Sequence, residues 1–452
     1  MIFCRFSTNT QPKSSPYLKT NTIRNMDFPK SIYVELTTRC NLQCSKCVKY
    51  TAGSCIPECD IELDVLHHLL PSLATIENLI LSGIGESLLH PNLSEIIGLA
   101  RKHMPASGTI GLQSNGYLLD RDKAVELIEQ GLTSLCFSVD SFNDTCSPHH
   151  ETGEHSFQAV KEAVENVNSA RQSTSTTLDL GLQIVLTDSS IEDLPSLVSW
   201  AAKNRIDYII ASHLIQYDSE VEKENLFNSH SLEAIQLYKK YCAKAASIGL
   251  SFEREFNQHR KTAGTKTNDG FSDLLDLFFK EARHSDIRLN FDHIKPISSE
   301  RTEEIKAVLD KAQKVALGSG IEFHLPHLHA NHQRECRFLR DKTTFISANG
   351  DVTPCHFLWH TYSTQVFNEN IKVRKRVYGN IGEKSLENIW LNKQYRIFRT
   401  EAEQYEYSSC WSCPQGPCAS LVNDASGYAN DCFGSQVPCG HCQWNLGGIR
   451  CL

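Results

Sequence analysis

The chain has 452 residues, of which 40% are hydrophobic and 22% are charged, and its formal net charge is −8 at pH 7. This length is enough for two or three domains, each with its own core. The acidic balance supplies no basic field for nucleic acid or for an anionic membrane, and no apolar run approaches the roughly 20 residues that span a bilayer. Nucleic acid and membrane are therefore not expected as partners.

The stretch before Met26 carries basic residues and many Ser and Thr but no acid. It suits a transit peptide only loosely, because it has neither an apolar signal core nor a clear amphipathic helix. We expect residues 1–27 to be a disordered tail, or Met26 to be the true start, and we expect a cytoplasmic protein.

From Ile32 to Ser212 short apolar runs alternate with stretches of helical periodicity. The Lys123–Gln130 run is followed by Gly131, a typical residue after a helix, and Ser156–Ala170 has its apolar residues on one face. The predicted strands are Ile32–Leu36, Leu79–Ser82, Thr109–Gln113, Ser134–Val139, Leu178–Leu186 and Tyr208–Ala211. Such alternation predicts an α/β fold with a parallel sheet and outer helices, curled or closed as a barrel.

Cys40, Cys44 and Cys47 form a C-x3-C-x2-C loop directly after the first predicted strand. Four cysteines would close a structural zinc or iron–sulfur site, whereas three leave one coordination position free for chemistry. The alternative is a zinc site completed by Cys55 or Cys59. Eighteen cysteines in a chain without a secretory signal favour metal binding over disulfides.

Three further motifs follow the next predicted strands: Ser82-Gly83-Ile84-Gly85-Glu86, Gln113-Ser114-Asn115-Gly116 and Ser138-Val139-Asp140-Ser141. The two glycines of the first motif would let a ligand approach the backbone, and Glu86 can accept hydrogen bonds from an ammonium group. The carboxyl ends of parallel strands meet at one edge, where ligand sites lie. Zinc gives no reason for these three motifs.

Together these residues resemble the radical SAM superfamily over roughly Ile32 to Ala211. The resemblance implies a partial (β/α)6 TIM-like barrel and a [4Fe–4S] cluster on the three cysteines, with S-adenosylmethionine (SAM) on the open iron. An electron from the cluster then cleaves SAM, and the 5′-deoxyadenosyl radical takes hydrogen from the substrate. By this resemblance Gly83, Gly85 and Glu86 bind the methionyl amino group, and Asn115 and Ser138 lie near the methionyl or ribose groups.

The sequence departs from the family pattern in several places, and its glycine element reads G-x-G-E where the family usually has a GGE run. Ser87 replaces a usual proline, and Lys46 stands where an aromatic residue usually precedes the third cysteine. The departure at Lys46 puts the usual packing against adenine in doubt.

The segment from Tyr217 to about Gly320 is charged and poor in strand signals. It contains the predicted helices Leu232–Ile248 and Glu303–Leu317, and Gly318 is expected to stop the second. We interpret this segment as a helical connector.

The C-terminal region is dense in cysteine and predicts a small metal-stapled domain. The candidate ligands are Cys336, Cys355, Cys410, Cys413, Cys418, Cys432, Cys439, Cys442 and Cys451. The G-x4-C element ending in Cys355 and the Cys410-x2-Cys413-x4-Cys418 run resemble the SPASM extension of radical SAM maturases, which implies one or two auxiliary [4Fe–4S] clusters. Nine thiols exceed the eight that two clusters need, so the partition stays open, and a zinc domain is the alternative.

The predicted domains are the tail 1–27, the barrel 28–216, the connector 217–330 and the cysteine-rich iron–sulfur domain 331–452. The resemblance implies a maturase that acts on a peptide or protein and receives electrons from a flavodoxin- or ferredoxin-type protein. It leaves open whether the reaction is of the oxidoreductase or the transferase type. The context of the first cysteines and the Cys439–Cys451 tail look most like metalloenzyme maturases. His356 replaces the Asp that anaerobic sulfatase maturases place after the matching cysteine, which argues against that activity. The alternatives are an enzyme that forms thioether or carbon–carbon crosslinks in peptides and a zinc-stapled interaction protein without catalysis.

Overall fold

The computed structural model describes residues 28–51, 54–139, 157–174, 177–217, 219–261, 269–285, 287, 299–331, 335–366, 369–404 and 438–452. Four predicted cluster ligands, Cys410, Cys413, Cys418 and Cys432, lie outside these ranges. Within them no helix has the length and apolar character needed to cross a membrane. The cytoplasmic location and the domain boundaries stay predictions.

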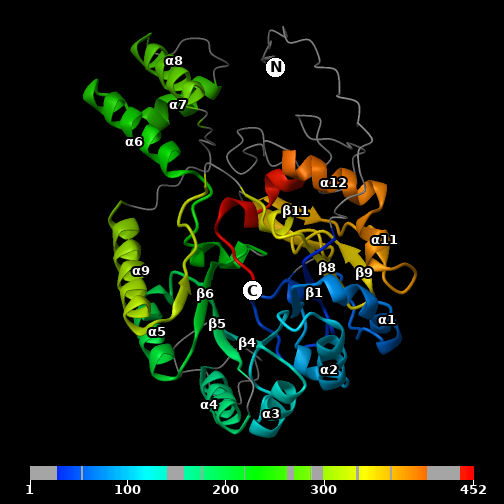
Figure 1. The fold of residues 1–452 in the computed structure, drawn as a ribbon. Coiled ribbons are helices and arrows are strands. Elements are labelled where there is room, and N and C mark those ends of the chain that lie inside the picture. Colours follow the sequence, from blue (N-terminus) through cyan, green and yellow to red (C-terminus); the bar gives the residue numbers. More distant parts are fainter. Residues whose placement is uncertain are drawn as a thin grey trace.

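The six predicted strands are all present and pair in parallel in sequence order, which confirms the α/β fold with a partial barrel (Figure 1). They are β1 Ser31–Val34, β2 Asn78–Leu81, β3 Thr109–Ser114, β4 Ser134–Val139, β5 Asp179–Leu186 and β6 Tyr208–His213. Their β-branched and other aliphatic side chains are buried almost throughout, as strands covered on both faces require.

Helices on the outer face of the sheet complete the β/α units. They are α1 Leu63–His67, α2 Leu93–His103, α3 Arg121–Glu129, α4 Phe157–Ser173 and α5 Leu194–Lys203. Helix α3 begins where Asp120 accepts a hydrogen bond from the Lys123 amide, and Gly131 follows it with φ +107°. The apolar face predicted for α4 is buried against the sheet.

Strands from the C-terminal half extend the same sheet on both sides. Strand β7 (Glu322–His324) pairs in parallel with β6, and β8 (Thr343–Ile346) pairs in parallel with β1. Strands β9 (Asp351–Thr353) and β12 (Gly379–Asn380) continue antiparallel to a total of ten strands. The predicted iron–sulfur region therefore shares a sheet with the barrel. Its remaining elements are the hairpin β10 Tyr362–Val366 and β11 Glu369–Val373, and the helices α10 Arg337–Arg340, α11 Leu386–Trp390 and α12 Lys393–Gln404.

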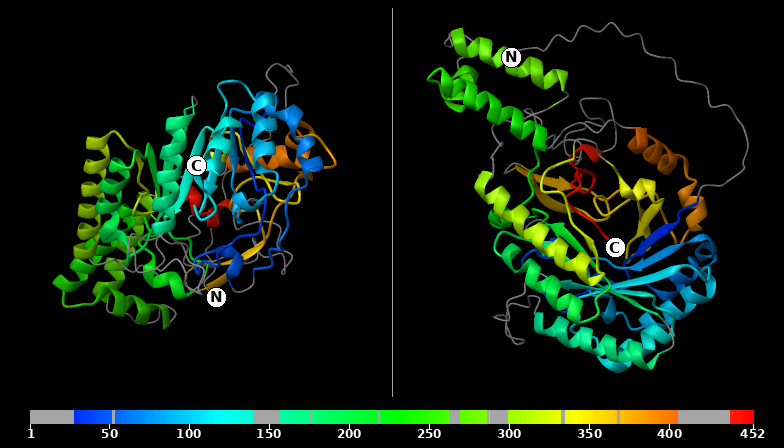
Figure 2. Two further views of the ribbon diagram at one scale, coloured as in Figure 1. Left: turned by 90° about the horizontal axis from the view of Figure 1, so that it is seen from below. Right: turned by 60° about the vertical axis from the view of Figure 1, so that its left-hand side comes forward.

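The predicted helical connector has two parts. Helices α6 (Leu232–Ser247), α7 (Phe252–Lys261) and α8 (Asp269–His284) share a separate apolar core and project from the barrel (Figure 1). Helix α9 (Ser299–Ser319) instead packs beside α5 and joins the main core (Figure 2). The expectation that Gly318 stops this helix is wrong, because Gly318 lies inside α9 and Gly320, with φ +75°, follows its end.

The C-terminal segment after Gly447 runs into the interior of the curved sheet. The His213 amide donates to the Gly448 carbonyl at 2.9 Å, and the Ser212 hydroxyl donates to the Arg450 carbonyl at 3.0 Å. The Tyr33 hydroxyl donates to the Leu452 carbonyl. Residues near the end of the chain thus line the inside of the barrel.

Candidate functional site

Cys40, Cys44 and Cys47 lie in the loop after β1 and line one cavity of about 280 Å³ at the carboxyl edge of the sheet. All three cysteines are partly exposed. Local bonds shape the loop: the Leu42 amide donates to Cys40 Sγ at 3.5 Å, and the Cys47 amide donates to the Cys44 carbonyl at 3.0 Å. The three thiols can therefore reach one ligand in this cavity.

A polar clamp holds the start of this loop. Arg39 donates to both carboxylate oxygens of Asp60, from Nε at 2.9 Å and from Nη2 at 2.6 Å. Thr37 also donates to Asp60, at 2.5 Å. These hydrogen bonds, with that from Arg39 the largest cause, lower the pKa of Asp60. The clamp fixes the direction in which the cysteine loop leaves the sheet.

The loop after β2 packs directly against the cysteine loop. The Glu86 amide donates to the Arg39 carbonyl at 2.8 Å. A Cβ on Gly85 would lie 2.3 Å from the Thr37 carbonyl oxygen and 2.4 Å from that of Arg39. Both glycines also allow protein segments to pack closely: Gly85 lies against the cysteine loop, and Gly83 lies against Glu35.

Glu86 is 3% exposed and joins the second motif to the third. Its Oε2 accepts from the Asn115 amide at 2.7 Å, and its Oε1 accepts from the Leu88 amide at 3.0 Å. Asn115 in turn donates through Nδ2 to Asn41 Oδ1 at 2.8 Å. Glu86 therefore connects the loop after β2 to the loop after β3.

Polar side chains continue across the cavity from β2 to β5. The Ser82 hydroxyl donates to Gln113 Oε1 at 3.0 Å, and Gln113 Nε2 donates to Ser138 Oγ at 3.2 Å and to Gln183 Oε1 at 2.9 Å. Ser138 therefore lines the cavity as expected. Its hydroxyl accepts a hydrogen bond from Gln113, which also donates to Gln183. Gln183 and Tyr217 also line the cavity and were missed, because neither belongs to a recognisable motif.

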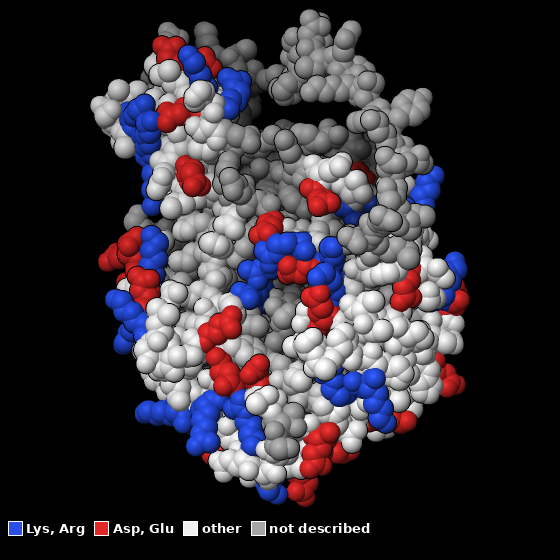
Figure 3. Space-filling model, viewed as in Figure 1, with Lys and Arg blue, Asp and Glu red and all other residues white. Residues whose placement is uncertain are grey.

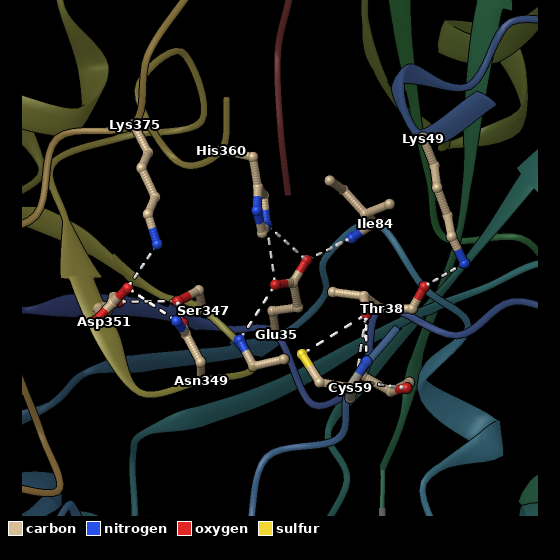
Figure 4. A network of polar contacts seen from close by, with 12 residues as sticks. Glu35, Thr38, Lys49, Cys59, Ile84, Ser347, Asn349, Asp351, His360 and Lys375 are labelled. Atoms are coloured by element: carbon tan, nitrogen blue, oxygen red, sulfur yellow. Dashed lines mark hydrogen bonds and ion pairs between the residues drawn. The ribbon is translucent and has the colours of Figure 1, made fainter. Parts of the chain in front are cut away.

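Burial and the charge of Lys49 act in opposite directions on the pKa of the first thiol. Burial raises the pKa of Cys40, whereas Lys49 acts in the opposite direction. The Lys49 side chain is 6% exposed and donates to Glu58 at 2.7 Å. It also donates to the Thr38 carbonyl at 2.8 Å (Figure 4). A thiol with a raised pKa ionises at neutral pH only beside a cation, such as a bound metal.

The two cysteines that could complete a zinc site differ in their exposure. Cys55 is exposed, and Cys59 is partly buried, with Thr38 donating to its carbonyl and its thiol. Across the described residues, no three His, Cys, Asp or Glu side chains converge on a single ion. A four-iron cluster takes its cysteines on separate irons, so it requires no such convergence.

A second cavity, of about 400 Å³, lies at the opposite end of the barrel interior and is bordered by five of the predicted auxiliary ligands. These ligands are Cys336, Cys355, Cys439, Cys442 and Cys451. Burial raises the pKa of Cys355 and Cys439 well above the ordinary value, and the neighbouring thiols raise it further. Thiols that are crowded in this way ionise together only around a cation, as the four cysteines of an iron–sulfur cluster do.

Cys451 stands apart from the other four thiols. It accepts a hydrogen bond from Trp444 Nε1 at 3.3 Å and lies 3.4 Å from His356 Nδ1. Cys336 and Cys442 raise the pKa of both Cys355 and Cys439, and Cys355 also raises the pKa of Cys439. Those four thiols are the candidate ligands of one auxiliary cluster.

Charged side chains of both signs are interspersed over the face in Figure 3. A group of Lys and Arg near its centre is bordered by acids. Such mixing gives this face no wide single-sign field of the kind that draws in nucleic acid.

Two segments match known families. Residues 34–197 match the Radical SAM superfamily, and residues 336–414 match SPASM, an iron–sulfur cluster-binding domain. The chain is 23% identical over 431 residues to the tungsten-containing aldehyde ferredoxin oxidoreductase cofactor-modifying protein of Pyrococcus furiosus, covering 93% of this chain and 97% of that protein.

Of two more similarities, one covers a smaller share of this chain and the other has a lower sequence identity. The chain is 26% identical over 223 residues to Fe-coproporphyrin III synthase of Methanosarcina barkeri, covering 48% of this chain and 53% of that protein. The solved structure of SuiB from Streptococcus suis bound to S-adenosylmethionine aligns over 87% of this chain and 74% of SuiB, with a TM-score of 0.48 and 13% identity.

Proposed function

This chain is a radical SAM protein with a SPASM domain, and we propose that it cleaves SAM reductively and uses the resulting radical to modify a peptide or protein. One observation carries the proposal: three thiols from one loop and the ends of three neighbouring strands surround a single cavity. When bound, the cluster and SAM supply an electron and a 5′-deoxyadenosyl radical.

The residues of this chain would bind and orient these groups. Cys40, Cys44 and Cys47 would hold the cluster as thiolates and leave one iron position open. Glu86, with Gly83 and Gly85 beside it, would bind the methionyl amino group. Asn115 and Ser138 would contact the methionyl or ribose groups.

The second cavity supports an auxiliary cluster held by Cys336, Cys355, Cys439 and Cys442, and Cys451 is kept as a candidate ligand. Cys410, Cys413, Cys418 and Cys432 remain candidates for a second auxiliary cluster. We propose a flavodoxin- or ferredoxin-type protein as the electron donor.

A metalloenzyme maturase is the finer proposal for the substrate. The name of the Pyrococcus furiosus relative, a protein that modifies the cofactor of a tungsten enzyme, supports this class, because the similarity runs nearly the full length of both chains. An enzyme that crosslinks peptides stays the enzymatic alternative.

The test is the formation of 5′-deoxyadenosine by anaerobically reconstituted, reduced protein with SAM. Cys40→Ala should abolish it, and Cys59→Ala should keep it, because Cys40 is proposed as a cluster ligand and Cys59 is not. Metal analysis runs beside the assay. Stoichiometric zinc, with no iron and no 5′-deoxyadenosine, would instead support the zinc-stapled interaction protein.

A further inference from the structure

Glu35 is a fully buried acid that belongs to none of the cluster or SAM motifs. It follows β1 directly, and its own amide donates to the Ile346 carbonyl at 2.9 Å. A buried carboxylate is costly unless its oxygens receive hydrogen bonds. Its partners therefore show what it holds in place.

Three donors surround the Glu35 carboxylate (Figure 4). The Ile84 amide donates to Oε1 at 2.9 Å, the Ala348 amide donates to Oε2 at 3.1 Å, and His360 Nε2 lies 3.1 and 3.0 Å from the two oxygens. An ionised carboxylate only accepts hydrogen bonds, so with Glu35 ionised His360 donates from Nε2 in this contact. The carboxylate is thus fully engaged.

The three donors come from two parts of the chain that are far apart in sequence. Ile84 is the second residue of the Gly83–Glu86 loop assigned to SAM. Ala348 lies in the turn between β8 and β9, and His360 follows the auxiliary ligand Cys355 by five positions. One side chain therefore ties the SAM loop to the auxiliary-cluster region.

Close packing of the SAM loop against the Glu35 side chain makes this connection rigid. A Cβ on Gly83 would lie 2.3 Å from Glu35 Cγ and 2.7 Å from Oε1, so the SAM loop rests directly on the Glu35 side chain. A displacement of Glu35 must therefore move the backbone of the loop.

We propose that Glu35 is a positioning residue, which sets the geometry of the SAM loop through the Ile84 amide and couples it to the auxiliary-cluster region through Ala348 and His360. This inference rests on the proposed function, since the loop is taken to bind SAM. As a consequence, SAM affinity depends on the structure around Cys355, because Ala348 and His360 connect that region to Glu35.

Glu35→Gln is the sharpest test, because it keeps the shape of the side chain but replaces one acceptor with a donor. That NH2 group would face an N–H group in a buried site, and we expect SAM to bind about tenfold more weakly. Iron content and the melting temperature of the reconstituted protein report separately on cluster loading and folding. Glu77→Gln is the matched control, because Glu77 is exposed and pairs with Lys30 on the surface.

His360 gives a second, independent pair of variants. His360→Gln keeps a donor and should retain the affinity of the parent, whereas His360→Leu removes the donor and should weaken SAM binding. Rescue by Gln separates a positioning hydrogen bond from loss of packing. If Glu35→Gln fails to fold, this pair still decides the matter.

The failures of the two proposals are distinguishable. If the parent protein neither binds nor cleaves SAM, the proposed function fails. If the parent cleaves SAM, and Glu35→Gln and His360→Leu bind it as the parent does, the positioning role of Glu35 is overturned alone.

Discussion

Replacing Gly85 with alanine tests the close contact between the SAM loop and the cysteine loop. The added Cβ would lie 2.3 Å from the Thr37 carbonyl oxygen and 2.4 Å from the Arg39 carbonyl oxygen, whereas ordinary contact begins at 3.4 Å. Both neighbours are backbone atoms and cannot rotate away. The two loops must separate by about 1 Å, and overpacking of this kind costs about 1–3 kcal/mol of the free energy of unfolding.

The effect on catalysis should exceed the effect on stability. A displacement of about 1 Å at a reacting site can lower the rate about 100-fold. We therefore expect Gly85→Ala to form 5′-deoxyadenosine about 100-fold more slowly with most of its iron retained, as followed by chromatography of anaerobic single-turnover reactions.

Gly318→Ala is the control for this change. Its Cβ would meet nothing within 4 Å, and it lies within α9, where alanine favours the helix by about 1 kcal/mol. If Gly85→Ala bound SAM and turned over at the rate of the parent, the proposed dependence of the site on the contact between the two loops would be refuted.

Two further predictions concern the second cavity and the buried histidine of β6. Cys442→Ala should remove about four irons per chain, while Cys242→Ala, in the projecting helices, should remove none; equal iron contents would exclude Cys442 as a ligand. Burial lowers the pKa of His213 to about 4, so the folded state binds fewer protons than the unfolded state between pH 4 and 6.5, and stability falls as the pH drops through that window. His213→Gln should therefore reduce the loss of unfolding free energy between pH 7.5 and 5.5 by about 1.3 kcal/mol in denaturant titrations, an effect that the exposed control His67→Gln should not produce.

The barrel was predictable because its information is local. Each strand from β1 to β6 is a short apolar run with a helix or a loop motif after it, and the parallel order follows from that alternation. The pairing of β8 with β1 was not predictable, because Thr343–Ile346 is a short run that lies far along the chain from Ser31–Val34.

The candidate site also has a part that local sequence predicts and a part that it does not predict. The cysteine spacing and the Gly83–Glu86 motif select residues that the structure brings to one cavity, but they give no sign that protein atoms pack closely against both glycines. Nothing local singles out Glu35, which looks like one more strand residue until Ala348 and His360 fold against it. Gln183 and Tyr217 were missed because neither belongs to a recognisable motif, and only the folded chain brings them to the cavity.

The most direct test of the account is electron paramagnetic resonance of the reduced protein with SAM labelled with 15N at its amino group. If Cys40, Cys44 and Cys47 leave one iron open, the spectrum should change on addition of SAM and show coupling to the labelled nitrogen. A spectrum that SAM leaves unchanged, from a cluster whose four irons all carry protein ligands, would contradict the account.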